Sequence, residues 1–443
     1  MSDQVSRAAP QARRALFAGG AGNFVEWFDF ALYGFLATVI ADEFFPGESR
    51  SAALLSTFGI FAVTFFVRPL GAVYFGRMGD RLGRRHTLTI VVLVMSGSTA
   101  LIGVLPTYDS IGVFAPLLLL ILRLVQGFSA GGEYSGASAF ILESAPADRR
   151  GRYASVLAIS TNAASLAAVA LVAVLTTVLG NTAMGEWGWR LPFLLSLPLG
   201  LCGLYLRLRA AESPVFTALA EDNEVESAPL GKTLRTQRRP IAIIFAIVSL
   251  SSIAFYVLKT YWPTYLSEET GLPRNEALWS SAVCFIVTIA LSPFFGSMSD
   301  RFGRRAIVLY SAAAMAVLAI PSFLLSGAGG FGPALAGQLL FVAAVGPLSP
   351  TVAVLLVEMF PANLRYTASS IGYNLAYMVF GGTAPYLATL LISQTGSRLA
   401  PAYYIVGVAA IALVIVALTL RETAPRATPP REAVLSDSWN ATV

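Results

Sequence analysis

Residues Gly76–Arg85 read GRMGDRLGRR, a short basic segment between two long apolar runs. The segment recurs at Gly296–Arg305 as GSMSDRFGRR, with seven of ten positions identical. A second pair of related segments, ESAPADRR from Glu143 and EMFPANLR from Glu358, repeats at nearly the same offset of about half the chain. Repetition at one spacing is the signature of a tandem duplication. The sequence therefore predicts two similar halves with an equivalent loop in each.

The composition indicates a membrane protein. Of the 443 residues, 56% are hydrophobic and 12% are charged, whereas a soluble protein has roughly a quarter of its residues charged. Twelve apolar segments are long enough to cross a hydrocarbon core of ~30 Å, and each must be a helix because a span has to satisfy its own backbone. They cover residues 15–40, 52–75, 87–106, 113–143, 153–179, 189–210, 240–267, 276–297, 306–326, 331–358, 367–393 and 400–421. We therefore expect an all-α membrane protein with twelve transmembrane helices.

A polar segment divides the chain into two six-helix bundles. Residues 211–239 are rich in Glu, Asp, Ser, Lys and Arg, and they separate the sixth apolar segment from the seventh. This composition predicts an N-terminal bundle at 15–210, a linker at 211–239 and a C-terminal bundle at 240–421, with terminal segments at 1–14 and 422–443. Two bundles of one orientation are typical of rocking transporters, whose substrate site lies between the bundles.

Lysine and arginine residues predict the orientation in the membrane. With the N-terminus inside, the cytoplasmic segments hold 23 of these residues and the outer loops hold 4. This asymmetry predicts that both termini are cytoplasmic. It also explains the net charge of +5 as membrane topology, so we expect no nucleic-acid partner.

The repeated basic loop has the chemistry of a gate on the cytoplasmic side. Its glycines allow a tight connection between two helices, and Asp80 stands where it can cap a helix start or accept from a neighbouring helix N-terminus. The candidate gate residues are Gly76, Asp80, Arg81, Gly83, Arg84, Arg85 and Glu143 in the first half and Asp300, Arg304 and Glu358 in the second. Because Ser299 replaces Gly79 in the second loop, we expect Asp300 to matter less than Asp80. Alternatively, the arginines only enforce the orientation.

Both loops resemble the signature loop of the major facilitator superfamily. Further motifs are similar to those of its metabolite:proton symporter branch, and they extend from the first apolar segment to the last. These motifs are GNFVEWFDF at 22–30, RPLG at 68–71, RLVQGFSAGGE at 123–133, WGWRLPF at 187–193 and PAYY at 401–404. The resemblance implies the major facilitator fold and proton-driven uptake of a small polar metabolite across the bacterial plasma membrane. Dicarboxylates, tricarboxylates, shikimate-like acids, proline and betaine are the substrates it implies.

Ionisable residues within the apolar segments are the candidates for proton coupling. Asp29 and Glu133 are the expected proton carriers, with Arg123 as the modulating charge, and Glu26 shares a helical face with Asp29. Charged groups inside a membrane are costly and usually have a function. A proton carrier needs a pKa near the working pH, and burial raises the pKa of a carboxyl group toward it. The alternative is a set of static ion pairs between helices. For Glu26 we favour this alternative, because a nearby arginine would keep it ionised.

A cation in the second half suggests how the substrate is held. Lys259 lies in the apolar stretch FYVLKTYWP at 255–263, where a lysine facing the central cavity would attract a carboxylate. Alternatively, its long side chain reaches the outer interface. The further substrate-binding candidates are Arg68, Tyr33, Tyr134, Tyr256, Tyr373, Asn374 and Tyr377. Within the spans the charges of three acids balance those of three bases, namely Glu26, Asp29 and Glu133 against Arg68, Arg123 and Lys259. Protonating one acid therefore leaves a net positive charge at the site. We therefore expect an organic acid such as a dicarboxylate as substrate, with a zwitterion such as proline or betaine as the alternative.

Other classes of function fit the sequence less well. Two unequal halves with gate motifs on one side suit alternating access better than the open pore of a channel, which is the more distant alternative. We expect no enzyme activity, because the spans hold no plausible nucleophile–base pair, and no cofactor or metal, because His and Cys form no cluster. The expected partners are the small-molecule substrate, protons and the lipid bilayer, with the protein acting as a monomer.

Overall fold

The described part of the chain is helical throughout. The structure is a computed structural model that describes residues 20, 23–82, 84–130, 138, 141–142, 145–208, 230–361 and 364–424. No strand occurs among these residues, which confirms the predicted fold class of an all-α membrane protein. The terminal segment predicted at 1–14 and most of the linker predicted at 211–239 lie outside the description, so the domain boundaries stay predictions.

The N-terminal half begins with a bent pair of helices. Helix Asn23–Phe35 and helix α2 (Ala37–Phe44) meet at an angle of 59°. The long helices that follow are α3 (Arg50–Leu82), α4 (Arg84–Gly103), α6 (Phe114–Ser129), α8 (Arg150–Ala183) and α9 (Arg190–Leu208). The short helical segments between them are α5 (Tyr108–Ile111), η1 (Ala147–Arg149) and η2 (Met184–Gly188).

The C-terminal half has more interruptions in its helices. Its long helices are α12 (Arg238–Tyr256), α14 (Arg274–Phe302), α15 (Arg304–Ser326), α16 (Phe331–Val345), α17 (Leu348–Glu358), α18 (Arg365–Ala376), α19 (Ala384–Thr395) and α20 (Ala400–Thr419). Its short elements are α11 (Leu230–Thr236), η3 (Val257–Tyr261), α13 (Trp262–Glu268) and η4 (Tyr377–Gly381). Helix α11 shows that the predicted linker ends in helical structure.

The predicted apolar segments fall on these helices wherever the structure describes them. Within the described residues, 8 helices are long and apolar enough to cross a membrane, and the bent pair at the start can be one more span. Three further apolar helices are shorter, at Thr89–Gly103, Phe114–Ser129 and Arg190–Tyr205. A total of twelve spans and the cytoplasmic placement of the termini stay predictions.

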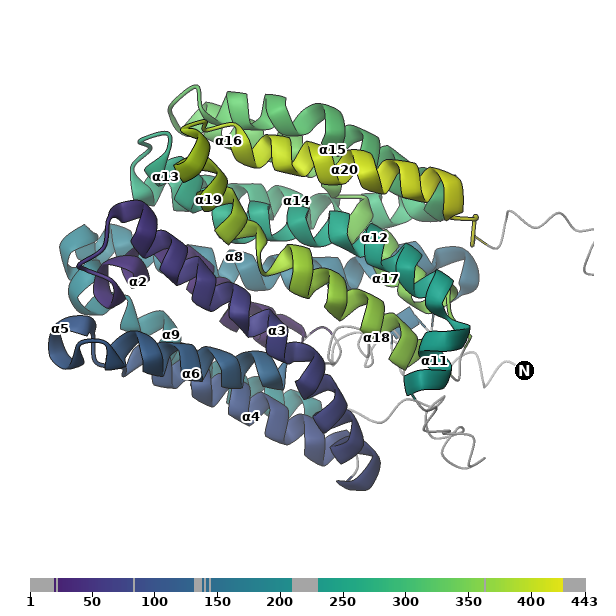
Figure 1. Cartoon of the computed structure of the whole chain (residues 1–443), viewed down its shortest axis with the longest axis horizontal. Coiled ribbons are helices and arrows are strands. Elements are labelled where there is room, and N and C mark those ends of the chain that lie inside the picture. Colours follow the sequence, from purple (N-terminus) through teal and green to yellow (C-terminus); the bar gives the residue numbers. More distant parts are fainter. Residues whose placement is uncertain are drawn as a thin grey trace, which may run out of the picture.

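The two halves face each other along extended contacts (Figure 1). Most helices of the N-terminal half, in purple and blue, lie below those of the C-terminal half, in teal to yellow. Between the halves, α8 packs along α14, and α3 packs against α18 and α19. The two basic segments, predicted as loops, are largely helical and form the ends of α3 and α14 and the starts of α4 and α15. These helix ends lie at the right of Figure 1, and we call this the loop end. The end that carries α2 and α13 is the opposite end.

Apolar side chains face outward as well as inward. On α20, Ile411, Val414 and Leu418 share one helical face and are 64%, 58% and 80% exposed. Soluble monomers rarely expose continuous apolar surface of this kind. The outer face of the helices is therefore suited to contact with lipid chains.

Two π-helical turns interrupt spans of the C-terminal half. Turn η3 precedes Pro263, and turn η4 precedes Pro385. A proline has no N–H group and its ring collides with the carbonyl four residues earlier, so the hydrogen-bond ladder shifts to a wider turn just before it. The two turns carry Lys259 and Tyr377, which are both predicted substrate-binding residues. Such turns are frequent at functional sites.

Candidate functional site

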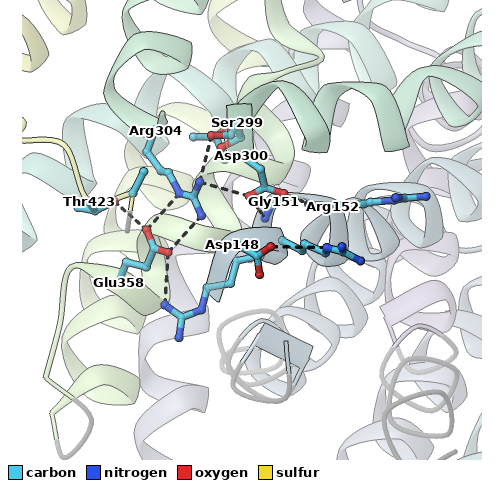
Figure 2. Close-up of polar contacts among 12 residues, drawn as sticks. Asp148, Gly151, Arg152, Ser299, Asp300, Arg304, Glu358 and Thr423 are labelled. Carbon is cyan, nitrogen blue, oxygen red and sulfur yellow. Dashed lines mark hydrogen bonds and ion pairs between the residues drawn. The ribbon is translucent and has the colours of Figure 1, made fainter. Parts of the chain in front are cut away.

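At the loop end, the three predicted gate residues of the second half form one buried cluster (Figure 2). Arg304, which is 1% exposed, donates from Nε and Nη2 to the Glu358 carboxylate at 3.2 and 3.3 Å. Its Nη1 lies 3.2 Å from Asp300 Oδ1 and donates to the Ser299 carbonyl at 3.0 Å. The structure therefore brings the three candidates together, and their role as a gate stays a prediction.

Asp300 also reaches across to the N-terminal half. Its two carboxylate oxygens accept hydrogen bonds from the backbone N–H groups of Gly151 and Arg152, at 2.8 and 2.9 Å (Figure 2). These N–H groups belong to the first turn of α8, where they have no partner within the helix. A carboxylate at this position also complements the helix dipole. The contact is of the type that the sequence predicted for Asp80 in the first loop.

Two glycines allow α8 and α14 to meet at this point. A Cβ atom built on Gly151 would lie 2.4 Å from the Gly296 carbonyl oxygen, and one built on Gly296 would lie 2.3 Å from the Gly151 carbonyl oxygen. Only residues without a Cβ atom allow two backbones to approach this closely. Gly296, the first residue of the second basic loop, is therefore part of the closed contact.

A further connection between the halves passes through Glu358. Arg150, the first residue of α8, lies with Nη1 3.3 Å from Glu358 Oε1. Thr423, which follows the last helix, donates to Glu358 Oε2 at 2.7 Å (Figure 2). Glu358 therefore binds Arg304 of its own half and Arg150 of the other half at the same time.

The residues after α20 also hold the start of α15. The Glu422 carboxylate accepts hydrogen bonds from the backbone N–H groups of Arg304 and Arg305, at 2.8 and 3.1 Å, as a helix cap does. Gly303 precedes α15 with a φ of 92°, and a Cβ atom there would lie 2.5 Å from Glu422 Oε2. The segment that the sequence assigned to a tail at 422–443 therefore begins inside the loop-end cluster.

Most side chains of the first basic loop lie outside the description. Four predicted residues fall outside the described ranges, namely Gly83, Glu133, Tyr134 and Glu143. For five more the structure gives the helix but not the side chain, namely Gly76, Asp80, Arg81, Arg84 and Arg85. The roles assigned to these residues stay predictions.

An ion pair joins the halves at the opposite end. Arg50 at the start of α3 donates from Nε and Nη2 to the two carboxylate oxygens of Glu268 on α13, at 2.8 and 2.7 Å. It also pairs with Asp42 on α2. The Arg50 and Glu268 side chains are 40% and 21% exposed, so water and salt screen this pair more than the buried Arg304 cluster. Contacts between the halves therefore close both ends, and those at the opposite end are weaker.

Two small cavities lie between the closed ends. Their volumes are about 20 and 50 Å³. They adjoin, because their walls share Thr161, Ser251, Phe255 and Ser349. Sites for small molecules typically span ~300–1,000 Å³. The structure is therefore a closed state in which the space between the halves is contracted.

Lys259 lines the larger of these cavities. The side chain is buried, and its Nζ donates to the Thr161 carbonyl at 3.3 Å and lies 4.3 Å from the centre of the Phe255 ring. Within the part of the chain that the structure describes, Lys259 forms no ion pair. A buried ammonium without a carboxylate is costly, so this placement suits an anionic group of a substrate.

Of the other substrate-binding candidates, some line a cavity and the others pack around the cavities. Tyr373 and Tyr377 line the smaller cavity. Tyr256 packs edge-on against aromatic rings of α3. Tyr33 lies 4.2 Å below the Arg123 guanidinium, and the Asn374 amide donates to the backbone of its own helix.

Glu26 and Arg68 form a buried ion pair within the N-terminal half. Arg68 Nη2 lies 2.9 Å from Glu26 Oε1, and the side chains are 4% and 2% exposed. The guanidinium also lies 4.8 and 5.0 Å from the ring centres of Phe30 and Phe65. This geometry fits the static ion pair that we favoured for Glu26 from the sequence. Arg68 thus has a structural partner away from the cavities.

We expect Glu26→Gln to destabilise the protein, because it leaves the Arg68 charge buried without its partner. Breaking one side of a buried ion pair costs ~3–5 kcal/mol. The double variant Glu26→Gln/Arg68→Met removes both charges and should recover most of this loss. Thermal unfolding of the purified variants measures both effects. Equal melting temperatures for the wild type and Glu26→Gln would contradict a stabilising role of the pair.

Asp29 and Arg123 are connected through two uncharged side chains. Thr99 Oγ1 lies 3.1 Å from Asp29 Oδ2 and accepts from Gln126 Nε2 at 2.6 Å, while Gln126 Oε1 accepts from Arg123 Nη1. Among the described residues, no ion pair joins Asp29 to Arg123, and Asp29 Oδ1 has no hydrogen-bond partner. Asp29 is 1% exposed and Arg123 is fully buried. The two charges therefore lie in one network without neutralising each other directly.

Thr99 has one hydroxyl proton and two acceptors within reach. Its Oγ1 lies 2.9 Å from the Met95 carbonyl oxygen and 3.1 Å from Asp29 Oδ2. A charged Asp29 requires Thr99 as donor, whereas a protonated Asp29 can donate to Thr99 and leave the hydroxyl proton to Met95. The network therefore accommodates both protonation states of Asp29.

Several residues of this region were not among the candidates from sequence. Trp27 and Phe255 line the smaller cavity. Trp27 directly follows the candidate Glu26 and Phe255 directly precedes the candidate Tyr256, which was the available signal in the sequence. No sequence pattern marks Arg50 or Glu422, since their partners come from distant parts of the chain. The described residues contain no group of three or more His, Cys, Asp and Glu side chains that could hold a metal ion.

Comparisons with known families and solved structures agree with this architecture. The model described as "Sugar (and other) transporter" matches residues 15–232, and the "Major Facilitator Superfamily" model matches residues 244–441. The structure of the proton:xylose symporter XylE bound to 6-bromo-6-deoxy-D-glucose has the same fold, with a TM-score of 0.76 at 20% identity. The match covers 94% of this chain and 97% of that one.

Relatives of known name are transporters. The proline/betaine transporter of Escherichia coli (strain K12) is 38% identical over 423 residues, which are 94% of this chain and 84% of that protein. The glycine betaine/proline/ectoine/pipecolic acid transporter OusA of Dickeya dadantii (strain 3937) is 36% identical over 421 residues, 93% of this chain and 84% of that protein. The chain therefore belongs to the major facilitator superfamily, within the metabolite:proton symporter family that its motifs resemble.

Proposed function

We propose that the protein is a proton-coupled symporter that imports a small zwitterion such as proline or glycine betaine. The observation that carries the substrate class is the identity of 38% and 36% with transporters of these solutes over nearly the whole chain. The buried Lys259 at the cavity suits the carboxylate that such zwitterions share. The relatives favour this alternative over the organic acid expected from the charge count.

Asp29 is the proposed proton carrier. Burying a charge without a paired partner is costly, and protonation of Asp29 removes that cost. Thr99 and Gln126 link Asp29 to Arg123, so a change of protonation alters the hydrogen bonds of the whole network. Glu133, which lies outside the described residues, stays the second candidate.

Alternating access is the proposed mechanism. The halves meet at the loop end through Asp300 and Glu358 and at the opposite end through Arg50 and Glu268. Opening one set of contacts while the other stays closed would expose the cavities to one side at a time. The lysine and arginine distribution supports a cytoplasmic position for the loop end. A single chain contains both halves, which supports action as a monomer.

Solute counterflow in proteoliposomes tests the substrate class. Vesicles that contain the purified full chain and are loaded with unlabelled glycine betaine or proline should accumulate the labelled solute from outside. Vesicles loaded with succinate or shikimate should not accumulate these acids. Counterflow of the acids without counterflow of proline or betaine would overturn the assignment, and passive non-saturable leak of all solutes would indicate a channel.

A further inference from the structure

Lys259 on η3 is a buried cation at the wall of the larger cavity. The residue is 6% exposed, and its Nζ donates to the Thr161 carbonyl of the N-terminal half at 3.3 Å. The ammonium also lies 4.3 and 5.6 Å from the ring centres of Phe255 and Phe285. A carbonyl oxygen and the faces of aromatic rings carry only partial negative charge. These contacts therefore hold the ammonium in place without neutralising it.

No described acid supplies the missing negative charge. None of the described residues that line the two cavities is an aspartate or a glutamate. Lys259 also forms no ion pair with any other residue of the described ranges. A buried charge is normally paired with an opposite charge, because an unpaired one is costly. The ammonium is therefore placed to bind an anion from solution.

Two serine hydroxyls on the same walls have no hydrogen-bond partner among the described residues. Ser251 on α12 and Ser349 on α17 line both cavities. The hydroxyls of Ser249 on α12 and Thr351 on α17 donate to the carbonyl four residues earlier, at 2.7 and 2.8 Å, as is usual in helices. Those of Ser251 and Ser349 make no such bond. Each can therefore donate to a ligand in the cavities.

The space beside these groups fits a single small ion. The larger cavity has a volume of about 50 Å³, and the smaller one, which shares Ser251 and Ser349, has about 20 Å³. One water molecule needs ~10–15 Å³ of such volume, whereas sites for small molecules span ~300–1,000 Å³. A chloride ion is only slightly larger than a water molecule. The closed state therefore has room for a chloride ion, and a whole substrate molecule needs a wider state.

We propose that Lys259, Ser251 and Ser349 form a binding site for a small monovalent anion such as chloride in the closed state without substrate. The ammonium supplies the opposite charge, and the hydroxyls supply hydrogen bonds, which are stronger when one partner is ionised. One part of this inference rests on the proposed function: a substrate carboxylate that pairs with Lys259 takes the place of the anion. The Lys259 charge is then neutralised both with and without substrate, so the halves can close in either case.

Chloride is the probe, and its binding is measured without substrate on the purified full chain in nanodiscs of uncharged lipids. Potassium chloride replaces potassium gluconate at constant ionic strength, so the screening of charges stays the same. Gluconate serves as the reference anion because it is too large for the cavities. The line width of the chloride NMR signal reports exchange between free and bound ions. We expect a saturable broadening for the wild type, and we expect an excess of proline to reverse it.

Substitutions then identify the residues that hold the anion. Lys259→Met should abolish the saturable broadening. Ser349→Ala or Ser251→Ala should weaken chloride binding about tenfold, because each removes one hydrogen bond to a charged partner. Ser249→Ala is the matched control, because Ser249 lies on α12, lines neither cavity and donates to its own helix. It should bind chloride as the wild type does. Melting temperatures show whether each variant is folded.

The outcomes distinguish this inference from the proposed function. Broadening that does not saturate in the wild type, or that is equal in the wild type and Lys259→Met, would overturn the anion site, while counterflow of proline or glycine betaine would still support the proposed function. Chloride binding that is lost in Lys259→Met would support the site even if no zwitterion showed counterflow, and the proposed function alone would then fail. Chloride binding that persists in saturating proline, in a protein that transports proline, would contradict the shared use of Lys259.

Discussion

Asp29→Asn is expected to abolish proton-driven accumulation of substrate while exchange of pre-loaded substrate continues. Asparagine has nearly the same shape and can keep the contact with Thr99, but it cannot take up or release a proton. A pH step of two units is worth ~2.7 kcal/mol for each proton carried, which drives up to ~100-fold accumulation at one proton per substrate. Uptake into proteoliposomes with such a step, compared with counterflow in the same vesicles, measures the loss.

The control for this prediction is Asp109→Asn, which changes an exposed aspartate on α5 in the same way. It should accumulate substrate as the wild type does. Normal accumulation by Asp29→Asn would show that another group carries the proton, and Glu133→Gln would then be the next variant to measure. Loss of both accumulation and counterflow would mean that Asp29 supports the fold or the site and is not a carrier.

Gly151→Ala is expected to keep the loop end from closing and so to stop transport. Its Cβ atom would lie 2.4 Å from the Gly296 carbonyl oxygen and 2.9 Å from Asp300 Oδ1. Backbone atoms of two packed helices cannot move aside independently, and overpacking of this kind costs ~1–3 kcal/mol. This cost falls only on the state in which the loop end is closed, so the balance shifts toward the open state by roughly 5- to 150-fold.

Thiol labelling reports this shift. A single cysteine at Ser251, which lines both cavities, is introduced after Cys202 and Cys284 are replaced by serine. In nanodiscs, where both ends are accessible, the cysteine at position 251 should react about tenfold faster when Gly151→Ala is also present than when it is absent. Gly97→Ala, at a glycine with open space around it, should change neither labelling nor transport. Unchanged labelling in Gly151→Ala would contradict the proposed closed contact.

For the second basic loop, the sequence predicted the residues of the cluster but not all of their contacts. The repeat identified Asp300, Arg304 and Glu358, and the structure brings them into one cluster. The sequence ranked Asp300 below Asp80 because a glycine is replaced beside it. This ranking overlooked that Asp300 contacts backbone N–H groups at the start of α8. Backbone donors from a distant helix leave no mark in a motif, so only the packing of the halves reveals them.

Local patterns predicted the elements better than the contacts between them. Apolar runs, prolines and basic loops mark helices, their breaks and their ends, and these depend on neighbours in the chain. The pair of Arg50 with Glu268 and the cap formed by Glu422 join residues far apart in sequence. Such contacts depend on how the two halves dock, which hydrophobic periodicity does not specify.

The substrate class was harder to predict from the sequence for a different reason. Counting charges within the spans favoured an anion, because Arg68, Arg123 and Lys259 were treated as one shared site. The structure separates them: Arg68 pairs with Glu26, Arg123 is hydrogen-bonded to Gln126, and Lys259 alone lines a cavity. Aromatic faces, which attract cations without carrying a formal charge, do not enter such a count at all. The relatives named for proline and betaine therefore support a different substrate class from the one that the charge count favoured.

Proton movement during glycine betaine entry tests the central claim most directly. Proteoliposomes with a weakly buffered exterior and no imposed pH or sodium gradient receive glycine betaine outside, and the external pH is recorded. We expect the exterior to become alkaline as protons enter with the substrate, and Asp29→Asn vesicles to show no such change. Saturable glycine betaine entry without any change of external pH, or entry that depends on sodium, would contradict it.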